Sequence, residues 1–311
     1  MSSSTDVPPL AKYLASTDKK TRDKAVKNLS IFLSNGTGNA IPDLEMAKLW
    51  KGIFYCFWMS DKPLVQQALA SELAEIILTI TDVPSSLNFL RGFWTTMVRE
   101  WSGIDRLRMD KYYMLVRRFV NASFRLLLRA EWDSISFEEY NSILSGPSGP
   151  LCFNDIRIPA SLAFHLAETY LEELDKVLGD ISMPNPPPVP LFTTLSPFLS
   201  LAARTQAKTT YKHLREVVFD PLLAALKVTR PENIPSRKRQ RLSASSLPNI
   251  IANACVSSPR QEGLMSNSAT RTALLQKIFE VASEEETRDS NRRKMYDLYK
   301  DAIEDDEGSE G

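Results

Sequence analysis

Helical periodicity runs through nearly every segment of this chain, and no convincing alternation of polar and apolar residues marks a β-strand. Apolar residues recur three and four positions apart, as one face of an α-helix requires. The helical patterns come in pairs that recur at about 40 to 50 residues, near the spacing of HEAT and armadillo units. No repeat is visible residue by residue. The sequence therefore predicts an all-α fold, an irregular α-solenoid of stacked helical hairpins that is HEAT/armadillo-like.

Changes in composition give the predicted domain boundaries. Residues 1–7 are polar and expected to be disordered, and residues 8–229 form the predicted α-helical solenoid domain. Residues 230–268 contain eight Ser, four Pro and no aromatic residue, so we expect a disordered Ser/Pro-rich linker. Helical patterns return at residues 269–303, and these C-terminal helices are expected to pack back on the body. Residues 304–311 form an acidic tail.

The overall composition is that of an ordinary globular protein. The chain has 311 residues, is 43% hydrophobic and 24% charged, and has a formal net charge of zero. Its three cysteines are far apart and odd in number, which argues against a disulfide framework and favours a reducing compartment. No apolar run approaches the roughly 20 residues that span a bilayer, so no membrane partner is expected.

Motifs for catalysis or for cofactor binding are missing from the sequence. There are two histidines, His165 and His213, and no Cys or His pair at ligand spacing, so no metal site is predicted. No dinucleotide-binding, Walker or kinase motif is present. We therefore expect a protein that is not an enzyme, with no cofactor and no small-molecule substrate. The alternative is an enzyme with an unrecognised site, whose signature would be a deep pocket with convergent polar groups.

Positive charge is concentrated between Ser85 and Ala130, which hold nine Lys/Arg and three Asp/Glu. On a helix of about 100° per residue, most of the cations after residue 106 fall on one narrow stripe about five turns long. The stripe lacks the acidic residues that a solvated helix usually carries at i,i+4, which favours contact with phosphates or with an acidic partner. The candidate residues for binding RNA or an acidic partner are Arg106, Arg108, Lys111, Arg118, Arg125 and Arg129.

Two alternatives to this interpretation involve no binding partner. The stripe could be a solvated face whose Lys and Arg stems cover apolar surface. It could also pair inside the protein with the acidic helix at Glu168–Asp175, which would remove it from the surface. The nearby Trp94 and Trp101 are candidates for interface anchors, although burial in the core is the more common role of such residues.

A second basic group lies in the SRKRQRL segment of the Ser/Pro-rich linker. Its residues are Arg237, Lys238, Arg239 and Arg241. A basic cluster in such a linker is accessible to an import receptor, so the sequence predicts nuclear import. Direct contact with RNA and a plain solvated linker remain the alternatives.

Several stretches carry a family resemblance. They read TRDKAVKNLSIFL, KLWKGIFYCFWMSDKPLVQQALA, FWTTMVREWSGIDRLRMDKYYMLVRRF, IPASLAFHLAETYLEELDKV and NRRKMYDLYKDAI. Together they cover most of Pro8–Ala225 and of Ala269–Ile303, and they resemble the eukaryotic nucleolar ribosomal RNA-processing protein 1 family. The segment Arg230–Ser268 does not look family-like.

The resemblance implies a non-enzymatic assembly factor of the large ribosomal subunit, located in the nucleus and the nucleolus. Such a protein joins pre-60S particles and is needed for processing of precursor RNA that contains the internal spacers. The implied partners are pre-60S assembly factors, ribosomal proteins and precursor rRNA. The alternative is an α-solenoid that acts in the nucleus as a protein–protein adaptor without direct RNA contact.

Overall fold

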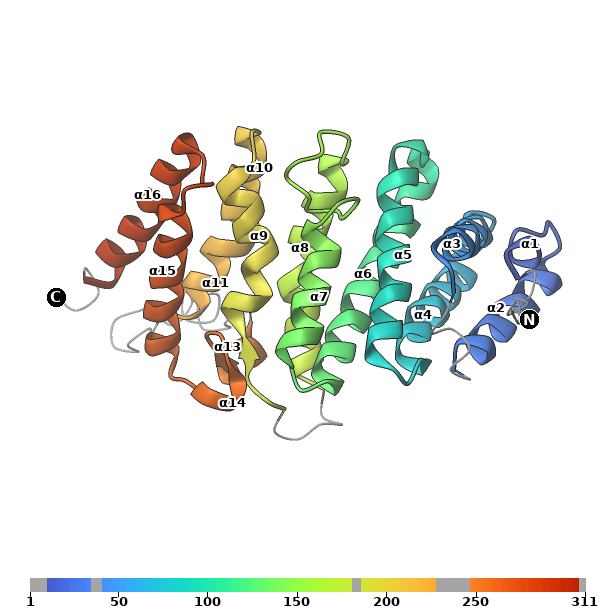
Figure 1. Cartoon of the computed structure of the whole chain (residues 1–311), viewed down its shortest axis with the longest axis horizontal. Coiled ribbons are helices and arrows are strands. Elements are labelled where there is room, and N and C mark those ends of the chain that lie inside the picture. The colour runs from blue at the N-terminus through green and yellow to red at the C-terminus, as the bar shows by residue number, and fades with distance from the viewer. Residues whose placement is uncertain (1–9, 35–40, 181–185, 228–246, 308–311) are drawn as a thin grey trace, which may run out of the picture.

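The computed structural model shows helical hairpins stacked side by side in a row (Figure 1). It describes residues 10–34, 41–180, 186–227 and 247–307. The all-α prediction is confirmed, because within these ranges the only sheet is one pair of two-residue strands, Val189–Pro190 (β1) and Ala254–Cys255 (β2).

The remaining elements are helices. In chain order they are α1 (Leu10–Leu14), α2 (Lys19–Ser34), α3 (Asp43–Trp58), α4 (Pro63–Thr79), α5 (Val83–Glu100), the 3₁₀ turn η2 (Trp101–Gly103), α6 (Arg106–Arg129), α7 (Ser134–Ser145), α8 (Ala160–Leu178), α9 (Leu191–Arg204), α10 (Lys208–Leu214), the π-helical turn η3 (Arg215–Phe219), α11 (Asp220–Ala225), α13 (Pro248–Ala252), α14 (Pro259–Glu262), α15 (Asn267–Ser283) and α16 (Asp289–Glu307).

The helices form two layers. In the front layer of Figure 1, α1, α3, α5, α7, α9 and α15 each pack against the next. Behind them α2, α4, α6 and α8 pack in the same way, and α10 and η3 follow α8. The helices α1 and α16 lie at opposite ends of the row. Each hairpin thus contributes one helix to each layer, an arrangement compatible with an irregular α-solenoid.

Residues at the breaks between the helical patterns determine where the next helices begin. Helix α4 begins with Pro63, whose missing N–H costs nothing in the first turn. The carboxylate of Asp82 accepts a hydrogen bond from the Ser85 N–H at 2.9 Å and caps α5. Asp105 caps α6 in the same way, by accepting from the N–H groups of Leu107 and Arg108. These local features fix where α4, α5 and α6 begin.

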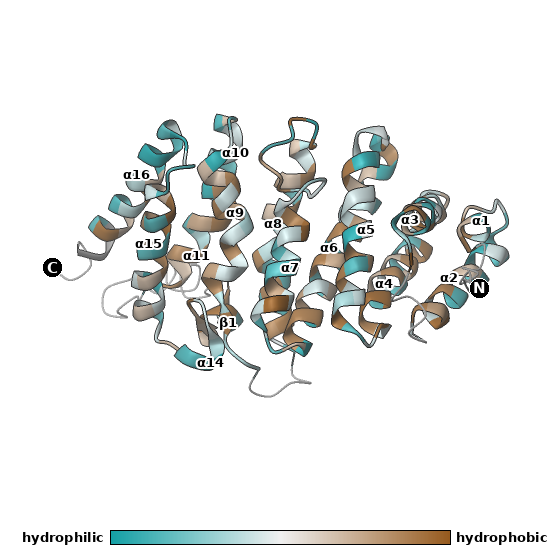
Figure 2. Ribbon diagram, viewed as in Figure 1, coloured by the Kyte–Doolittle hydropathy of each residue, from teal (hydrophilic) through white to brown (hydrophobic). Residues whose placement is uncertain are grey.

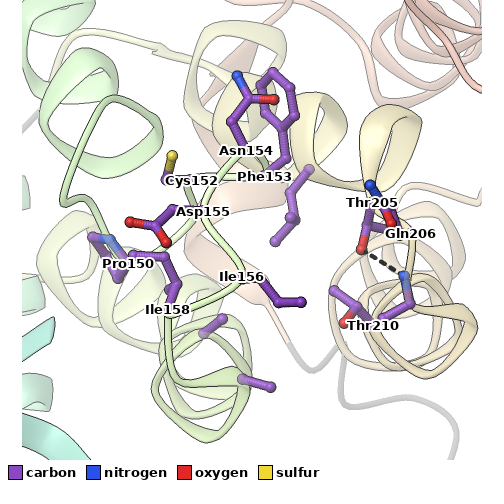
Figure 3. Close-up of a pocket in the computed structure, with 14 residues that line it drawn as sticks. Pro150, Cys152, Phe153, Asn154, Asp155, Ile156, Ile158, Thr205, Gln206 and Thr210 are labelled. Carbon is purple, nitrogen blue, oxygen red and sulfur yellow. Dashed lines mark hydrogen bonds between the residues drawn. The ribbon is translucent and has the colours of Figure 1, made fainter.

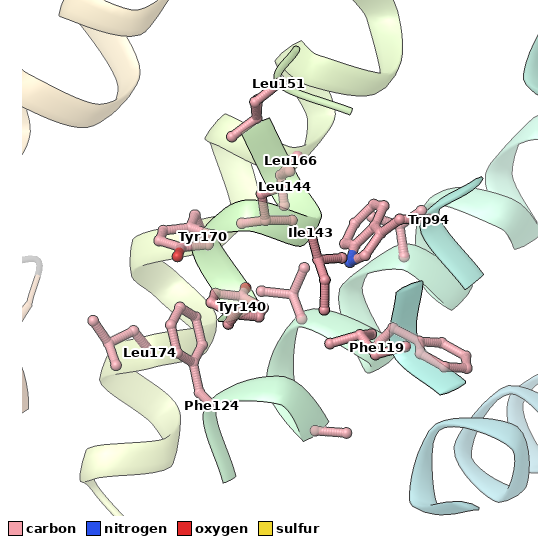
Figure 4. Close-up of a cluster of buried hydrophobic side chains, with 14 of the residues drawn as sticks. Trp94, Phe119, Phe124, Tyr140, Ile143, Leu144, Leu151, Leu166, Tyr170 and Leu174 are labelled. Atoms are coloured by element: carbon pink, nitrogen blue, oxygen red, sulfur yellow. The ribbon is translucent and has the colours of Figure 1, made fainter. Parts of the chain in front are cut away.

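Aromatic side chains fill the core where α5, α6, α7 and α8 meet (Figure 4). The rings of Phe93 and Phe119 stack with centroids 3.8 Å apart. Trp94 is fully buried, and the buried Trp101 donates its Nε1 hydrogen to Ser161 Oγ at 3.0 Å. Both tryptophans are therefore core residues, and their interpretation as interface anchors is wrong.

The expectation of disorder over residues 230–268 is wrong for residues 247–268, which form α13, β2, α14 and the start of α15. Leu247 and Ile250 are buried against the body, and β2 pairs in parallel with β1. Figure 2 shows that α14 is largely hydrophilic, so apolar burial alone does not explain the order of this segment.

Two carboxylates supply the missing stabilisation of residues 247–268. Asp175 of α8 accepts hydrogen bonds at 2.9 Å from the N–H groups of Asn249 and Ile250, which are the first turn of α13. The carboxylate of Glu262 accepts from the N–H groups of three consecutive residues, 256–258. A Ser/Pro-rich segment can therefore be ordered when carboxylates of the body and of the segment itself accept hydrogen bonds from its backbone N–H groups.

The C-terminal helices pack on the body. Helix α15 contacts α9 and α16, and its Leu274 and Ile278 are buried. The amide of Asn291 at the start of α16 donates to the carbonyls of Ala203 and Thr205, at 3.3 and 2.8 Å. The predicted disordered residues 1–7 and the end of the acidic tail, from residue 308, lie outside the described residues.

Candidate nucleic-acid interface

Helix α6, which carries the predicted basic stripe, lies between α4 and α8 in the second layer. Half of its 24 residues are buried, so only a narrow strip of the helix reaches solvent. Whether each candidate cation is free to bind RNA therefore depends on the contacts that its side chain makes.

Lys111 is buried, with 6% of its surface exposed, and the prediction that it contacts RNA is wrong. Its ammonium group donates hydrogen bonds to the carbonyls of Phe57, Trp58 and Ser60, at 3.0, 2.7 and 2.8 Å. These carbonyls lie at the C-terminal end of α3, where helix carbonyls have no partner within the helix. Burial, and secondarily the charge of Arg108, lowers the pKa of Lys111 to about 8.

Two further candidates bind the neighbouring helix α4. The guanidinium of Arg129 donates to the carbonyls of Leu78 and Ile80, at 2.8 and 3.1 Å, and so caps the C-terminal end of α4. Arg125 forms an ion pair with Glu75 of α4. Both side chains keep part of their surface exposed, but their hydrogen-bonding groups already have partners inside the chain.

The other three candidates differ from one another. Arg108 pairs with Asp105 and lies 4.7 Å from the centroid of the Trp58 ring. Arg106 and Arg118 are exposed, and no residue in the described ranges pairs with either of them. Only these two of the six predicted residues present an unengaged positive charge.

Sequence reasoning missed Arg117, which links α6 to the acidic helix. Its guanidinium pairs with Glu172 and, at 3.1 Å, with the buried Glu173 of α8. Among the described residues, none of the six stripe cations forms an ion pair with Glu168–Asp175, and the α6 cation that does is Arg117. The sequence offered one signal, because Arg117 lies about 100° around the helix from Arg118 and so falls outside the predicted stripe.

Charge alternates from helix to helix across the second layer. The ion pairs that join α6 to α4 and α8 are Arg125–Glu75, Arg117–Glu172 and Arg117–Glu173. We call this set the interhelix charge ladder. It includes only one residue of the α6 stripe, Arg125, whose carboxylate partner lies on the adjacent helix α4.

Comparison with known proteins gives the chain a family. A family model described as "Nucleolar protein, Nop52" matches residues 5–299. The chain belongs to the Nop52 family. Ribosomal RNA processing protein 1 homolog B of Homo sapiens is 34% identical over 245 residues, which cover 76% of this chain and 31% of the human protein. Homolog A of Homo sapiens is 28% identical over 332 residues, which cover 95% of this chain and 70% of that protein.

More distant Nop52 relatives match over a similar range. The Ribosomal RNA processing protein 1 homolog of Dictyostelium discoideum is 27% identical over 308 residues, 93% of this chain and 57% of its own length. The chain spans about a third of the human homolog B, with 31% of that protein covered. The resemblance seen in the sequence is thus confirmed, and so is the nucleolar location that it implies, because the Nop52 family is one of nucleolar proteins.

The predicted import residues of this Nop52 protein, Arg237, Lys238, Arg239 and Arg241, lie outside the described residues. Their role in nuclear import stays a prediction. No helix within the described ranges is long and apolar enough to cross a bilayer.

One recess of about 410 Å³ lies between the loop before α8 and the turn after α9 (Figure 3). Its lining is mainly apolar, with Ile156, Ile158 and Leu201 among the residues. Its carboxylate, Asp155, forms a salt bridge with Arg157 at 2.8 Å, and that hydrogen bonding lowers the pKa of Asp155 to about 2. A carboxylate held ionised in this way is a poor general acid. No cluster of His, Cys, Asp and Glu that could hold a metal occurs among the described residues.

Proposed function

We propose that this Nop52-family protein is a non-enzymatic scaffold of pre-60S ribosomal particles that is required for processing of large-subunit precursor rRNA. The observation that carries the proposal is the family match over residues 5–299. The relatives of this chain are named for ribosomal RNA processing. Stacked hairpins offer extended surfaces for several partners at once, which is how helical repeat proteins usually act.

Depletion of the protein from its own cells tests the proposal. We expect large-subunit precursor RNA to accumulate while the small subunit matures normally, as followed by pulse-labelling of RNA. A tagged copy should sediment with and purify pre-60S particles. Normal maturation of the large subunit after full depletion would contradict the scaffold function.

A second candidate is a nuclear protein–protein adaptor that never touches RNA. The contacts of the α6 stripe favour it, because four of the six predicted RNA-binding cations have partners within the chain. In-cell RNA crosslinking separates the two candidates. Adducts on large-subunit precursor RNA support the RNA-contacting scaffold, whereas pre-60S proteins recovered without adducts support the adaptor.

A further inference from the structure

Helix α2 carries positive charge that lies outside the interhelix charge ladder. Three of its lysines, Lys20, Lys24 and Lys27, are exposed. None of them forms an ion pair with any residue in the described ranges. The α6 stripe, by comparison, keeps only Arg106 and Arg118 free.

The three lysines share one face of α2. At about 100° per residue they fall within about 60° of one another, over a rise of about 10 Å. The buried residues of α2 include Ala25 and Leu29, which lie on the opposite side of the helix. The lysine face therefore points away from the core, and we call it the α2 lysine stripe.

The acidic residues of the same hairpin do not neutralise the α2 lysine stripe. Asp18 accepts hydrogen bonds from the N–H and the hydroxyl of Thr21, at the start of the helix. Asp23 pairs with Lys19, which lies outside the stripe. On the adjacent α4, Glu72 feels the charge of Lys27, but burial dominates and raises the pKa of Glu72. The stripe thus presents three positive charges with no acidic partner in hydrogen-bond contact.

We propose that the α2 lysine stripe binds the phosphate backbone of RNA. The inference rests on the proposed function for the identity of the polyanion. Charge complementarity selects an anionic partner, and lysine binds phosphate as a compact point charge. Lysine is depleted in the centres of protein–protein interfaces, which argues against an acidic protein as the occupant. The exposed Ile31 lies one turn further along the same face, but a single exposed apolar residue is normal on a protein surface.

Salt-dependent binding of fluorescein-labelled oligouridylate to the full chain, followed by fluorescence anisotropy, tests the proposal. The variant Lys20→Gln/Lys24→Gln/Lys27→Gln removes the stripe. Each phosphate contact contributes about 0.7 to the slope of log K against log salt for single strands, so the slope should fall by about 2. Affinity at low salt should fall on the order of tenfold or more.

A matched control removes the same charge elsewhere. Lys48, Lys212 and Lys300 are exposed, and each pairs with a glutamate three or four residues away in the chain. Their triple change to Gln should leave most of the affinity and the salt slope in place, whereas the triple change of the stripe to Arg should retain binding. Circular dichroism checks that every variant is folded.

Three outcomes would contradict RNA binding by the α2 lysine stripe. They are equal losses in the two Gln triples, no binding of oligouridylate by the wild-type chain at low salt, and displacement of the RNA by polyglutamate at equal charge concentration. None of them affects the scaffold function, which rests on particle association and on RNA processing in cells.

Discussion

At the scale of single residues, Lys111 shows how a cation in a basic stripe can be a structural residue. Its ammonium group binds three carbonyls at the end of α3. Lys111→Met keeps the apolar stem but leaves those buried carbonyls without a donor. We expect a loss of about 2–4 kcal/mol in the free energy of unfolding, measured by urea denaturation.

The matched control for Lys111 is Arg118→Met on the same helix. Arg118 is exposed and has no partner in the described part of the chain, so its change should cost within about 0.5 kcal/mol. Equal stability of the two variants would show that the carbonyl contacts of Lys111 contribute nothing.

The lowered pKa of Lys111 gives a pH prediction of its own. The group titrates at about 8 in the folded protein, below the ordinary 10.5 of an unfolded lysine. Between these two values the unfolded chain binds more protons, so this lysine contributes stability that increases as the pH rises. The difference in unfolding free energy between the wild type and Lys111→Met should therefore widen between pH 8 and 10.5. A constant difference would contradict the lowered pKa.

At the scale of elements, the short helix α13 depends on one carboxylate of α8. Asp175 accepts the N–H groups of Asn249 and Ile250 and thus caps α13 from a distant part of the chain. Asp175→Ala should cost about 0.5–2 kcal/mol, as loss of an N-cap does. Amide hydrogen exchange should accelerate first in residues 247–256, while Glu172→Ala, an exposed change on the same helix, should leave their exchange rates unaltered.

The same element shows which features the sequence could predict. The spacing of apolar residues and the residues that interrupt it predicted the helical hairpins, because both signals depend only on neighbouring residues in the sequence. The order of residues 247–268 depends on Asp175, which is 74 positions from Asn249, and composition cannot report such a contact. The stripe on α6 was visible from helical spacing, but its partners Glu75 and the carbonyls of α3 and α4 belong to other helices. The unpaired lysines of α2 could be recognised only after those partners were known.

At the scale of the whole molecule, the interhelix charge ladder joins the helices of the second layer, and its rungs differ in burial. Arg125 and Glu75 are 41% and 49% exposed, whereas Glu173, which pairs with Arg117, is 5% exposed. Exposed pairs typically contribute about 0.2–1 kcal/mol and are screened by salt. Salt screens an ion pair less when its carboxylate is buried. The ion pairs of the ladder should therefore stabilise the contact of α6 with α8 more than the contact of α6 with α4.

Double-mutant cycles in urea denaturation test this difference between the two rungs. The coupling energy of Arg125 with Glu75 should be within about 1 kcal/mol and should fall when the salt is raised to about 1 M, where the screening length is about 3 Å. The coupling of Arg117 with Glu173 should be larger and should persist in salt, because Glu173 is buried and its partner lies at 3.1 Å. The charge exchange Arg125→Glu/Glu75→Arg should restore most of the stability that either single reversal loses. If both couplings vanish in salt, the ladder is only a surface feature, and hydrophobic packing alone joins these helices.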